Sequence, residues 1–223
     1  MKIDEIKNLL FDLDGTLVDS SRTIRNSLEF AVSSMGLATE GRTPIESLIG
    51  APLLDIFRNE YDMTEEQAHT AIKLYREHYD SLAQAGTRVY DHIRHVLPLL
   101  GAAGYRLVVA TVKPTEIATR VLTDLGLRGC FDGVAGSSMD SSRRDKSSII
   151  GHAVRKYGLN PEQSIMIGDR DQDINGARDN GMSSIAVTYG FGTRDELQSA
   201  RPDHLVDGFD QIGHLFLNPT VAK

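Results

Sequence analysis

The chain has 223 residues, of which 40% are apolar and 25% are charged, and its formal net charge is −7. This length and composition are typical of a globular protein with one large domain or a domain that carries an insertion. The acidic balance argues against a nucleic-acid-binding protein, because phosphate backbones favour basic surfaces. No apolar run approaches the roughly 20 residues that span a bilayer, and the charges at Lys2, Asp4 and Lys7 argue against a signal peptide. We therefore expect a cytoplasmic protein without a membrane partner.

Short apolar runs recur along the chain and are separated by helical patterns. The first run, 9–11, ends abruptly at Asp12, and runs of this kind suit buried parallel strands. Later runs of the same character are 107–110, 133–135, 165–167, 184–187 and 204–206. Helical patterns lie between them at 93–100, 117–125, 147–157 and 174–180. This alternation predicts an α/β fold with a doubly wound, mostly parallel sheet and helices on both of its faces.

Residues 19–86 interrupt this alternation. They show helical patterns at 24–35, 52–60 and 65–82, and Thr64 and Gln67 are placed to form a capping box at the start of the last one. We expect an inserted helical cap domain at 19–86 and a catalytic core formed by 1–18 and 87–223. The linkers near 19–21 and 83–88 form the expected hinge, with Gly86 as its flexible point, and 218–223 is expected to be a loose tail.

The residues that follow the predicted strands are the candidates for chemistry, because open parallel sheets bind ligands beyond the carboxyl ends of their strands. They are Asp12 and Asp14 after 9–11, Thr111 and Lys113 after 107–110, Lys146 in the helix that follows 133–135, and Gly168, Asp169 and Asp173 after 165–167. We expect the carboxylates, the hydroxyl and a lysine of this set to converge at one edge of the sheet. The glycine-rich loop at 189–192 should border the same site, since it also follows a buried strand.

This set matches the needs of phosphoryl transfer. Carboxylate oxygens suit Mg²⁺, and a metal with a lysine can neutralise the charge of a transferring phosphate. One aspartate can attack phosphorus, while a second carboxyl protonates the leaving oxygen and later activates water. Each residue taken alone also has a structural interpretation. Asp14 begins an ordinary turn signal, Asp169 and Asp173 suit the first turn of a helix, and Thr111 and Lys146 suit a turn and a solvated surface.

Two motifs identify a resemblance. The stretch from Phe11 to Ser20, FDLDGTLVDS, resembles the first signature of the haloacid dehalogenase superfamily, and 167–174, IGDRDQDI, resembles its last signature. Thr111 and Lys146 resemble the second and third signatures. Essentially the whole chain is similar to the phosphoglycolate phosphatase-like group, which has a Rossmann-like core and a helical cap.

The resemblance implies a role for each matching position. Asp12 is the nucleophile and a metal ligand, and Asp14 is the general acid and base whose main-chain carbonyl also binds the metal. Asp169 ligates Mg²⁺, and Asp173 orients the metal shell. The phosphate is held by Thr111, by Lys146 and by backbone amides near Gly15 and Val112.

Two positions depart from the pattern of relatives. Val112 stands where relatives often carry Asn or Ser, and Ser147 replaces the proline that commonly follows the lysine. In the cap, the break at Gly50 resembles the specificity loop of capped relatives, and Arg58 is the candidate substrate contact.

We predict a magnesium-dependent phosphomonoesterase that acts on a small phosphorylated metabolite, phosphoglycolate-like or a 5'-nucleotide, through an aspartyl-phosphate. A sugar phosphomutase of the β-phosphoglucomutase type is the alternative, because it shares the core residues. A phospho-acceptor signalling module is disfavoured by the pair of aspartates after the first strand and by the helical insertion. We expect a monomer or a weak homodimer that binds no nucleic acid.

Overall fold

The computed structural model of the chain describes residues 3–39, 41–138 and 143–217. It divides into two compact units, Met1–Val18 with Val89–Lys223 and Asp19–Arg88. The second junction lies two residues beyond the predicted start of the core at residue 87. The predicted tail at 218–223 lies outside the described residues.

A six-stranded parallel sheet, with strand order β5-β4-β1-β6-β7-β8, forms the centre of the first unit. The strands are β1 (Asn8–Phe11), β4 (Arg106–Pro114), β5 (Gly133–Ser137), β6 (Ser164–Gly168), β7 (Ser183–Val187) and β8 (His204–Val206). The chain runs outward from β1 through β4 and β5, and then continues on the other side of β1 with β6. This reversal makes the sheet doubly wound, so the predicted α/β class is confirmed.

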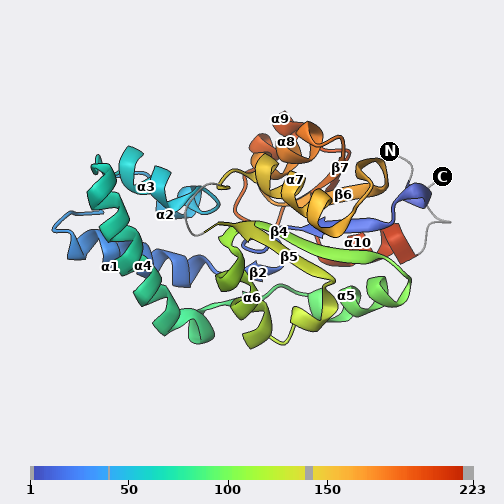
Figure 1. The fold of residues 1–223 in the computed structure, drawn as a ribbon, viewed down its shortest axis with the longest axis horizontal. Helices are drawn as coiled ribbons and strands as arrows, with labels where there is room; N and C mark the ends of the chain where they lie inside the picture. Colours follow the sequence, from blue (N-terminus) through green and yellow to red (C-terminus); the bar gives the residue numbers. More distant parts are fainter. Residues whose placement is uncertain (1–2, 40, 139–142, 218–223) are drawn as a thin grey trace. The chain divides into compact units, whose positions relative to one another are not determined.

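Helices cover both faces of this sheet (Figure 1). One face carries α7 (Lys146–Tyr157), α8 (Asp171–Asp179) and α9 (Arg194–Ala200), and the other carries α5 (Ile93–Ala102), α6 (Thr115–Asp124) and α10 (Phe209–Leu217). The period of two along a strand explains how β1 serves both layers. Leu10 packs in the core cluster that contains Ile149 and Ile150 of α7, whereas the next residue, Phe11, packs against Phe209 of α10.

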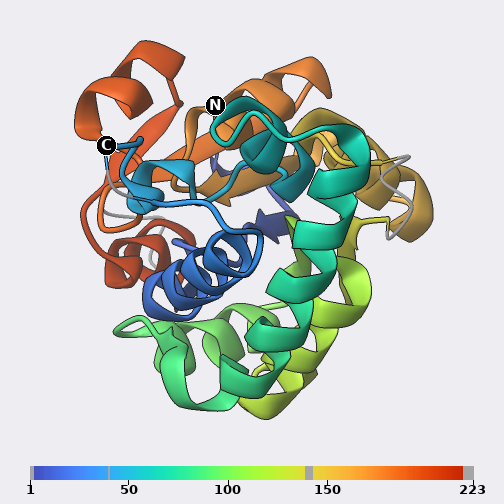
Figure 2. The same ribbon diagram turned by 90° about the vertical axis from the view of Figure 1, so that its left-hand side faces the viewer.

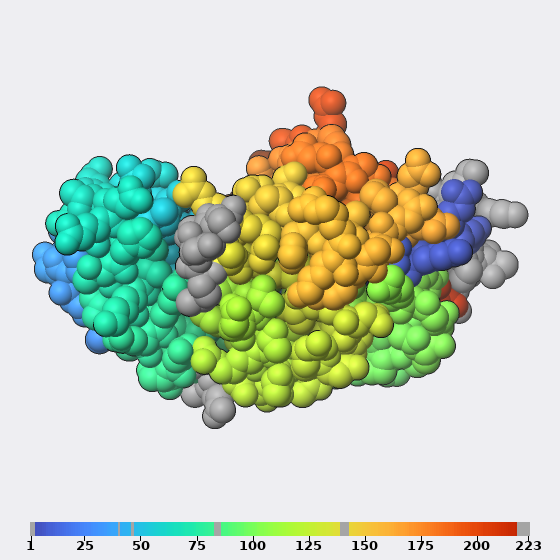
Figure 3. Space-filling view, viewed as in Figure 1, coloured from blue at the N-terminus to red at the C-terminus, as the bar shows by residue number. Residues whose placement is uncertain are grey.

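The edge strand β5 is covered by the helices that flank it. All five of its residues are buried. In the space-filling view of Figure 3, yellow-green atoms of α6 and yellow-orange atoms of α7 meet along this side of the unit. Burial of edge residues is one way in which a sheet limits pairing with a strand of another chain.

The second unit is helical. It contains α1 (Ser21–Ser34), α2 (Ile45–Leu48), α3 (Leu53–Asn59) and α4 (Glu65–Gly86), and α1 packs against α4 (Figure 2). The predicted capping box is present at the start of α4, where Gln67 N–H donates to Thr64 Oγ1 and Thr64 N–H donates to Gln67 Oε1. The helix continues four residues beyond the predicted end at 82.

The two linkers pair as β2 (Val18–Asp19) and β3 (Arg88–Val89). Arg88 Nη2 donates to Asp19 Oδ2 at 3.0 Å across this pair. The hydrophobic pattern does not predict the pair, because a strand of two residues is too short to show a period. In the described ranges, each helix lacks either the length or the apolar character that a bilayer crossing requires.

Replacement of Leu10 by alanine should lower the free energy of unfolding by about 2–5 kcal/mol, because it leaves a cavity between β1 and α7. Leu99→Ala is the control, since the Leu99 side chain on α5 is 42% exposed and its loss should change stability by less than about 0.5 kcal/mol. Urea unfolding followed by circular dichroism measures both values. Equal losses in the two variants would contradict this assignment of the core.

Candidate active site

The site begins where β1 ends. Asp12 directly follows β1, and its N–H donates to Ile167 O of β6 at 2.9 Å, so the backbone holds Asp12 at the carboxyl edge of the sheet. The next residues turn sharply, with a hydrogen bond of 2.8 Å from Gly15 N–H to Val18 O. Gly15 has a φ of +88°, and a Cβ there would lie 2.1 Å from Asp169 Oδ2. Only glycine fits this turn, both for its backbone angle and for its closeness to Asp169.

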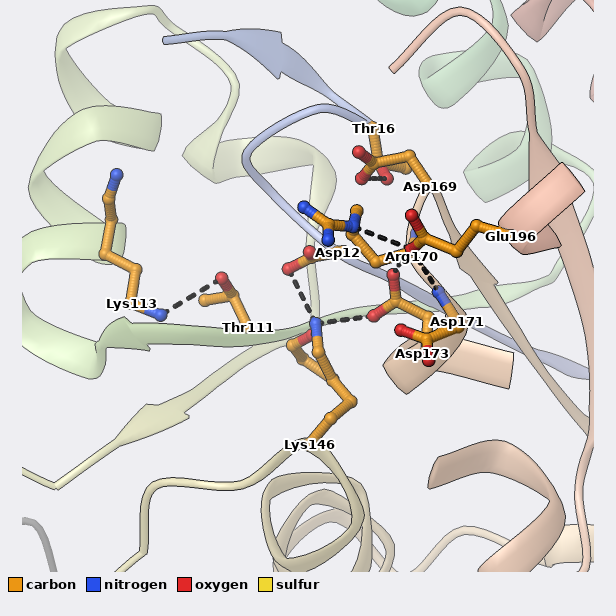
Figure 4. Close-up of polar contacts among 11 residues, drawn as sticks. Asp12, Thr16, Thr111, Lys113, Lys146, Asp169, Arg170, Asp171, Asp173 and Glu196 are labelled. Atoms are coloured by element: carbon orange, nitrogen blue, oxygen red, sulfur yellow. Dashed lines mark hydrogen bonds and ion pairs between the residues drawn. The ribbon is translucent and has the colours of Figure 1, made fainter. Parts of the chain in front are cut away.

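Lys146, the first residue of α7, is the cation at the centre of the site (Figure 4). Its Nζ lies 2.9 Å from Asp12 Oδ1 and 2.7 Å from Asp173 Oδ1, and it donates to Ala110 O of β4 at 3.1 Å. Burial by itself lowers the pKa of Lys146, but the charges of Asp12 and Asp173 outweigh burial and raise the pKa above its usual value. Lys146 is therefore a charged ammonium that contacts Asp12 after β1, Ala110 within β4 and Asp173 in the first turn of α8.

Asp169 follows β6 and is held from two sides. Thr16 Oγ1 donates to its Oδ1 at 2.9 Å, and the N–H of Phe191 donates to its Oδ2 at 2.8 Å. A Cβ on Gly190 would lie 2.3 Å from Asp169 Cβ, so the loop after β7 packs directly on this residue. Burial raises the pKa of Asp169 well above its ordinary value, and the charges of Asp173 and Asp12 raise it further.

Asp12, Asp169 and Asp173 form a buried carboxylate cluster. Each offers an oxygen that lies within 4.8 Å of the oxygens of the other two. Burial raises the pKa of Asp173 to about 6, although Lys146 opposes this shift. Lys146 pairs with only two of these carboxylates, so the three in their ionised form carry an excess of negative charge, and their oxygen donors suit Mg²⁺. The residues present therefore fit a hard divalent cation.

Strand β4 extends beyond its predicted end at residue 110. Thr111, Val112 and Lys113 all lie within β4, whose register with β5 shifts between Ala110 and Pro114. Thr111 is buried, and its Oγ1 accepts a hydrogen bond from the N–H of Lys113 at 3.3 Å. The half-buried Val112 side chain packs on the core cluster beneath α7.

Lys113 is the residue whose role the sequence motifs did not assign. Its Nζ lies 2.8 Å from Asp14 Oδ1 and 2.7 Å from Asp14 Oδ2, and both side chains are almost buried. Asp14 thus pairs with Lys113, whereas Asp12 pairs with Lys146. The sequence feature that could have indicated a role in the site is the position of Lys113, two residues after Thr111 in the segment that follows the predicted strand.

The predicted site residues of the first unit gather at one edge of the sheet. The ion pairs and close contacts described above join Asp12, Lys146 and Asp173, and Gly15 lies against Asp169. Arg58 belongs to the other unit, where it is exposed near the end of α3. Its contact with substrate stays a prediction, as do the individual roles of the other residues.

A doubly wound sheet with an acidic centre beyond β1 and β6, and a helical insertion after β1, defines an α/β protein with an inserted helical unit. The model of the haloacid dehalogenase-like hydrolases matches residues 9–187, and the chain belongs to this family. The expected resemblance is confirmed.

Several relatives share most of the chain. A 5'-nucleotidase of Pseudomonas aeruginosa is 38% identical over 88% of this chain and 89% of its own length. A phosphoglycolate phosphatase of Salmonella choleraesuis is 27% identical over 95% of this chain and 92% of its own. The tyrosine-protein kinase PtkA of Mycobacterium tuberculosis is 35% identical over 84% of this chain and 64% of its own.

A solved structure has the same fold. The predicted phosphatase from Clostridium acetobutylicum superposes with a TM-score of 0.90 at 35% identity, covering 95% of this chain and 98% of that one. Family, relatives and fold together make this chain a phosphatase of the haloacid dehalogenase-like family.

If the carboxylate cluster holds Mg²⁺, the stabilisation of the folded protein by Mg²⁺ should be larger at about pH 7 than at about pH 5. The pKa of Asp173 rises from 3.8 to about 6 on folding, and that of Asp169 also rises. The raised pKa of Asp173 stabilises the folded protein at pH values below 3.8. This contribution to the free energy of unfolding is lost as the pH rises through the pKa of the folded state. The metal favours the ionised carboxylates and so offsets that loss.

The melting temperature, measured with and without saturating Mg²⁺ at both pH values, tests this expectation. Asp169→Asn removes a carboxylate charge from the cluster and should reduce the gain at the higher pH. A gain that is equal at the two pH values, or absent at both, would show that the cluster does not hold the metal.

Proposed function

We propose that this phosphatase depends on Mg²⁺ and hydrolyses a small phosphorylated metabolite through an aspartyl-phosphate on Asp12. The observation that carries the proposal is the environment of Asp12, a buried carboxylate that is paired with Lys146 and lies beside Asp169 and Asp173. The names of the nucleotidase and phosphoglycolate phosphatase relatives support a 5'-nucleotide or a phosphoglycolate-like acid as substrate.

In the first step, a carboxylate oxygen of Asp12 attacks phosphorus, and the bond from phosphorus to the ester oxygen breaks. The ammonium of Lys146, the hydroxyl of Thr111 and backbone amides near Gly15 and Val112 bind the phosphoryl oxygens. Asp12, Asp169 and the main-chain carbonyl of Asp14 would hold Mg²⁺, with Asp173 orienting the shell, and the cation would supply neutralisation of the phosphate charge. The products of this step are the acyl-phosphate and the leaving alcohol.

Asp14 acts as the general acid and then as the general base. Its carboxyl donates a proton to the leaving oxygen, and the resulting carboxylate then takes a proton from the water that attacks phosphorus. Inorganic phosphate leaves, and the Asp12 carboxylate is restored. The two aspartates lie beside different lysines, and different surroundings allow two carboxyls to hold different roles.

The second candidate function is transfer of the phosphoryl group from Asp12 to the hydroxyl group of an acceptor molecule instead of to water. A sugar phosphomutase would use the same first step, and similarity to a protein named as a tyrosine kinase favours a non-water acceptor. A panel of phosphorylated metabolites assayed with Mg²⁺, and with EDTA as the control, separates the candidates. Hydrolysis releases inorganic phosphate in proportion to substrate lost, whereas transfer yields a new phosphoester without it.

Asp12→Asn should be inactive and should form no covalent intermediate, because the attacking oxygen is lost. Asp14→Asn should turn over very slowly but should still become phosphorylated by para-nitrophenyl phosphate, whose leaving group needs little protonation. Acid quench and intact mass spectrometry detect the added phosphate. A phosphorylated Asp12→Asn variant would show that the nucleophile is another residue.

Lys113→Met should slow turnover of an alkyl phosphate by about 10- to 100-fold, because the Asp14 carboxyl loses the contact that positions it. The loss should be smaller for para-nitrophenyl phosphate, and Lys113→Arg should recover part of the activity. The control is Lys156→Met, which removes an exposed lysine from α7. If Lys113→Met slowed both esters equally, Lys113 would not act through Asp14.

A further inference from the structure

The loop after β7, residues 189–192, approaches the Asp169 carboxylate by more than one route. The N–H of Phe191 donates directly to Asp169 Oδ2 at 2.8 Å. A Cβ on Gly192 would lie 2.0 Å from the main-chain oxygen of Asp169, so the backbones of the loop and of Asp169 are in direct contact. Tyr189, the first residue of the loop, lies outside the motifs that resemble the family signatures, but its side chain provides a second route to the same carboxylate.

This second route passes through Thr16. The hydroxyl of Tyr189 donates to the main-chain oxygen of Thr16 at 2.8 Å. The hydroxyl of Thr16 donates in turn to Asp169 Oδ1 at 2.9 Å, and Figure 4 shows this bond. The loop therefore determines the surroundings of both carboxylate oxygens, Oδ2 directly through Phe191 and Oδ1 through Tyr189 and Thr16.

The Tyr189 side chain is itself held in place by a second tyrosine. Its ring packs against the ring of Tyr90, with centroids 4.8 Å apart and planes inclined by 59°. The N–H of Tyr90 donates to Leu17 O at 3.2 Å. Two adjacent carbonyls of the turn after β1, those of Thr16 and Leu17, are therefore bound by the two members of one aromatic pair.

The Tyr189 hydroxyl is a neutral donor beside an acidic cluster. Burial raises the pKa of this hydroxyl well above its ordinary value, and the charge of the nearby Asp169 raises the pKa further. The hydroxyl therefore stays protonated at neutral pH. It adds no charge to the carboxylate cluster, and its proton is available to the Thr16 carbonyl.

The hydrogen bonds to Asp169 orient the carboxylate without using all of its acceptor capacity. An ionised carboxylate has about four lone-pair sites, so the bonds from Thr16 and Phe191 leave positions for a cation. Mg²⁺ demands near-ideal octahedral geometry, and the partners that orient a metal ligand typically change metal affinity by about 10- to 100-fold. The bond from Tyr189 fixes one of these partners.

We propose that Tyr189 is a positioning residue of the metal site, which raises the affinity for Mg²⁺ by orienting Asp169 through Thr16. This inference rests on the proposed function, because it requires that the carboxylate cluster holds Mg²⁺. In this role Tyr189 acts through Thr16 and needs no contact of its own with metal or substrate.

Tyr189→Phe removes the hydroxyl and keeps the ring. Calorimetric titration of the full chain with MgCl₂ should give a dissociation constant about tenfold higher than that of the wild type. Tyr157→Phe is the matched control, because the Tyr157 hydroxyl also donates to a main-chain oxygen, that of Val134, at 2.9 Å, and Tyr157 lies at the opposite end of α7 from Lys146. The control should bind Mg²⁺ as the wild type does.

A double-mutant cycle with Thr16→Val tests the route. Tyr189→Phe should raise the dissociation constant much less in the Thr16→Val background than in the wild type, because the bond through which it acts is already lost. If Tyr189→Phe does not fold, Tyr90→Leu removes the ring that supports Tyr189 and should also weaken Mg²⁺ binding.

Wild-type affinity in Tyr189→Phe, or an equal effect of this change in both backgrounds, would overturn the inference and leave the proposed function in place. Asp169→Asn is the reference for the second case, because it should weaken Mg²⁺ binding whatever the role of Tyr189. Absence of Mg²⁺ binding by the wild-type protein would overturn the proposed metal dependence and this inference with it.

Discussion

The ammonium of Lys146 between the carboxylates of Asp12 and Asp173 is the interaction on which the site depends. All three groups are almost fully buried, and a buried charge without a partner is strongly destabilising. The ion pairs hold the end of β1, the start of α7 and the first turn of α8 together, and the bond to Ala110 O adds β4. Buried ion pairs often contribute little net stability, so chemistry is the better reason for this arrangement.

The same edge of the sheet separates two aspartates that lie only two residues apart. Asp12 faces Lys146 and the buried cluster, whereas Asp14 turns to Lys113 at the end of β4. The tight turn at Gly15 makes this divergence possible, because it reverses the backbone directly after Asp14. One short motif thus supplies two carboxyls in two environments, as a two-step phosphoryl transfer needs.

The position of the third carboxylate, Asp169, is fixed by backbone segments that pack closely against it. Gly15 comes from the turn after β1 and Gly190 from the loop after β7, and neither leaves space for a side chain beside Asp169. Thr16 and the N–H of Phe191 then bind its two oxygens. Asp169 is consequently held in a single orientation, which reduces the reorganisation needed when a cation binds.

The sequence by itself determined the strand pattern, the helical insertion, the capping box at Thr64 and the residues that follow β1 and β6. These features depend on neighbours within a few residues, where period, turn and capping rules apply. Only the tertiary structure decided that Lys113 pairs with Asp14, that the N–H of Phe191 in the loop after β7 binds Asp169 and that the two linkers pair. Each of these contacts joins segments about 20 to 100 residues apart. No local period encodes such contacts, because they arise only when the strands are brought side by side.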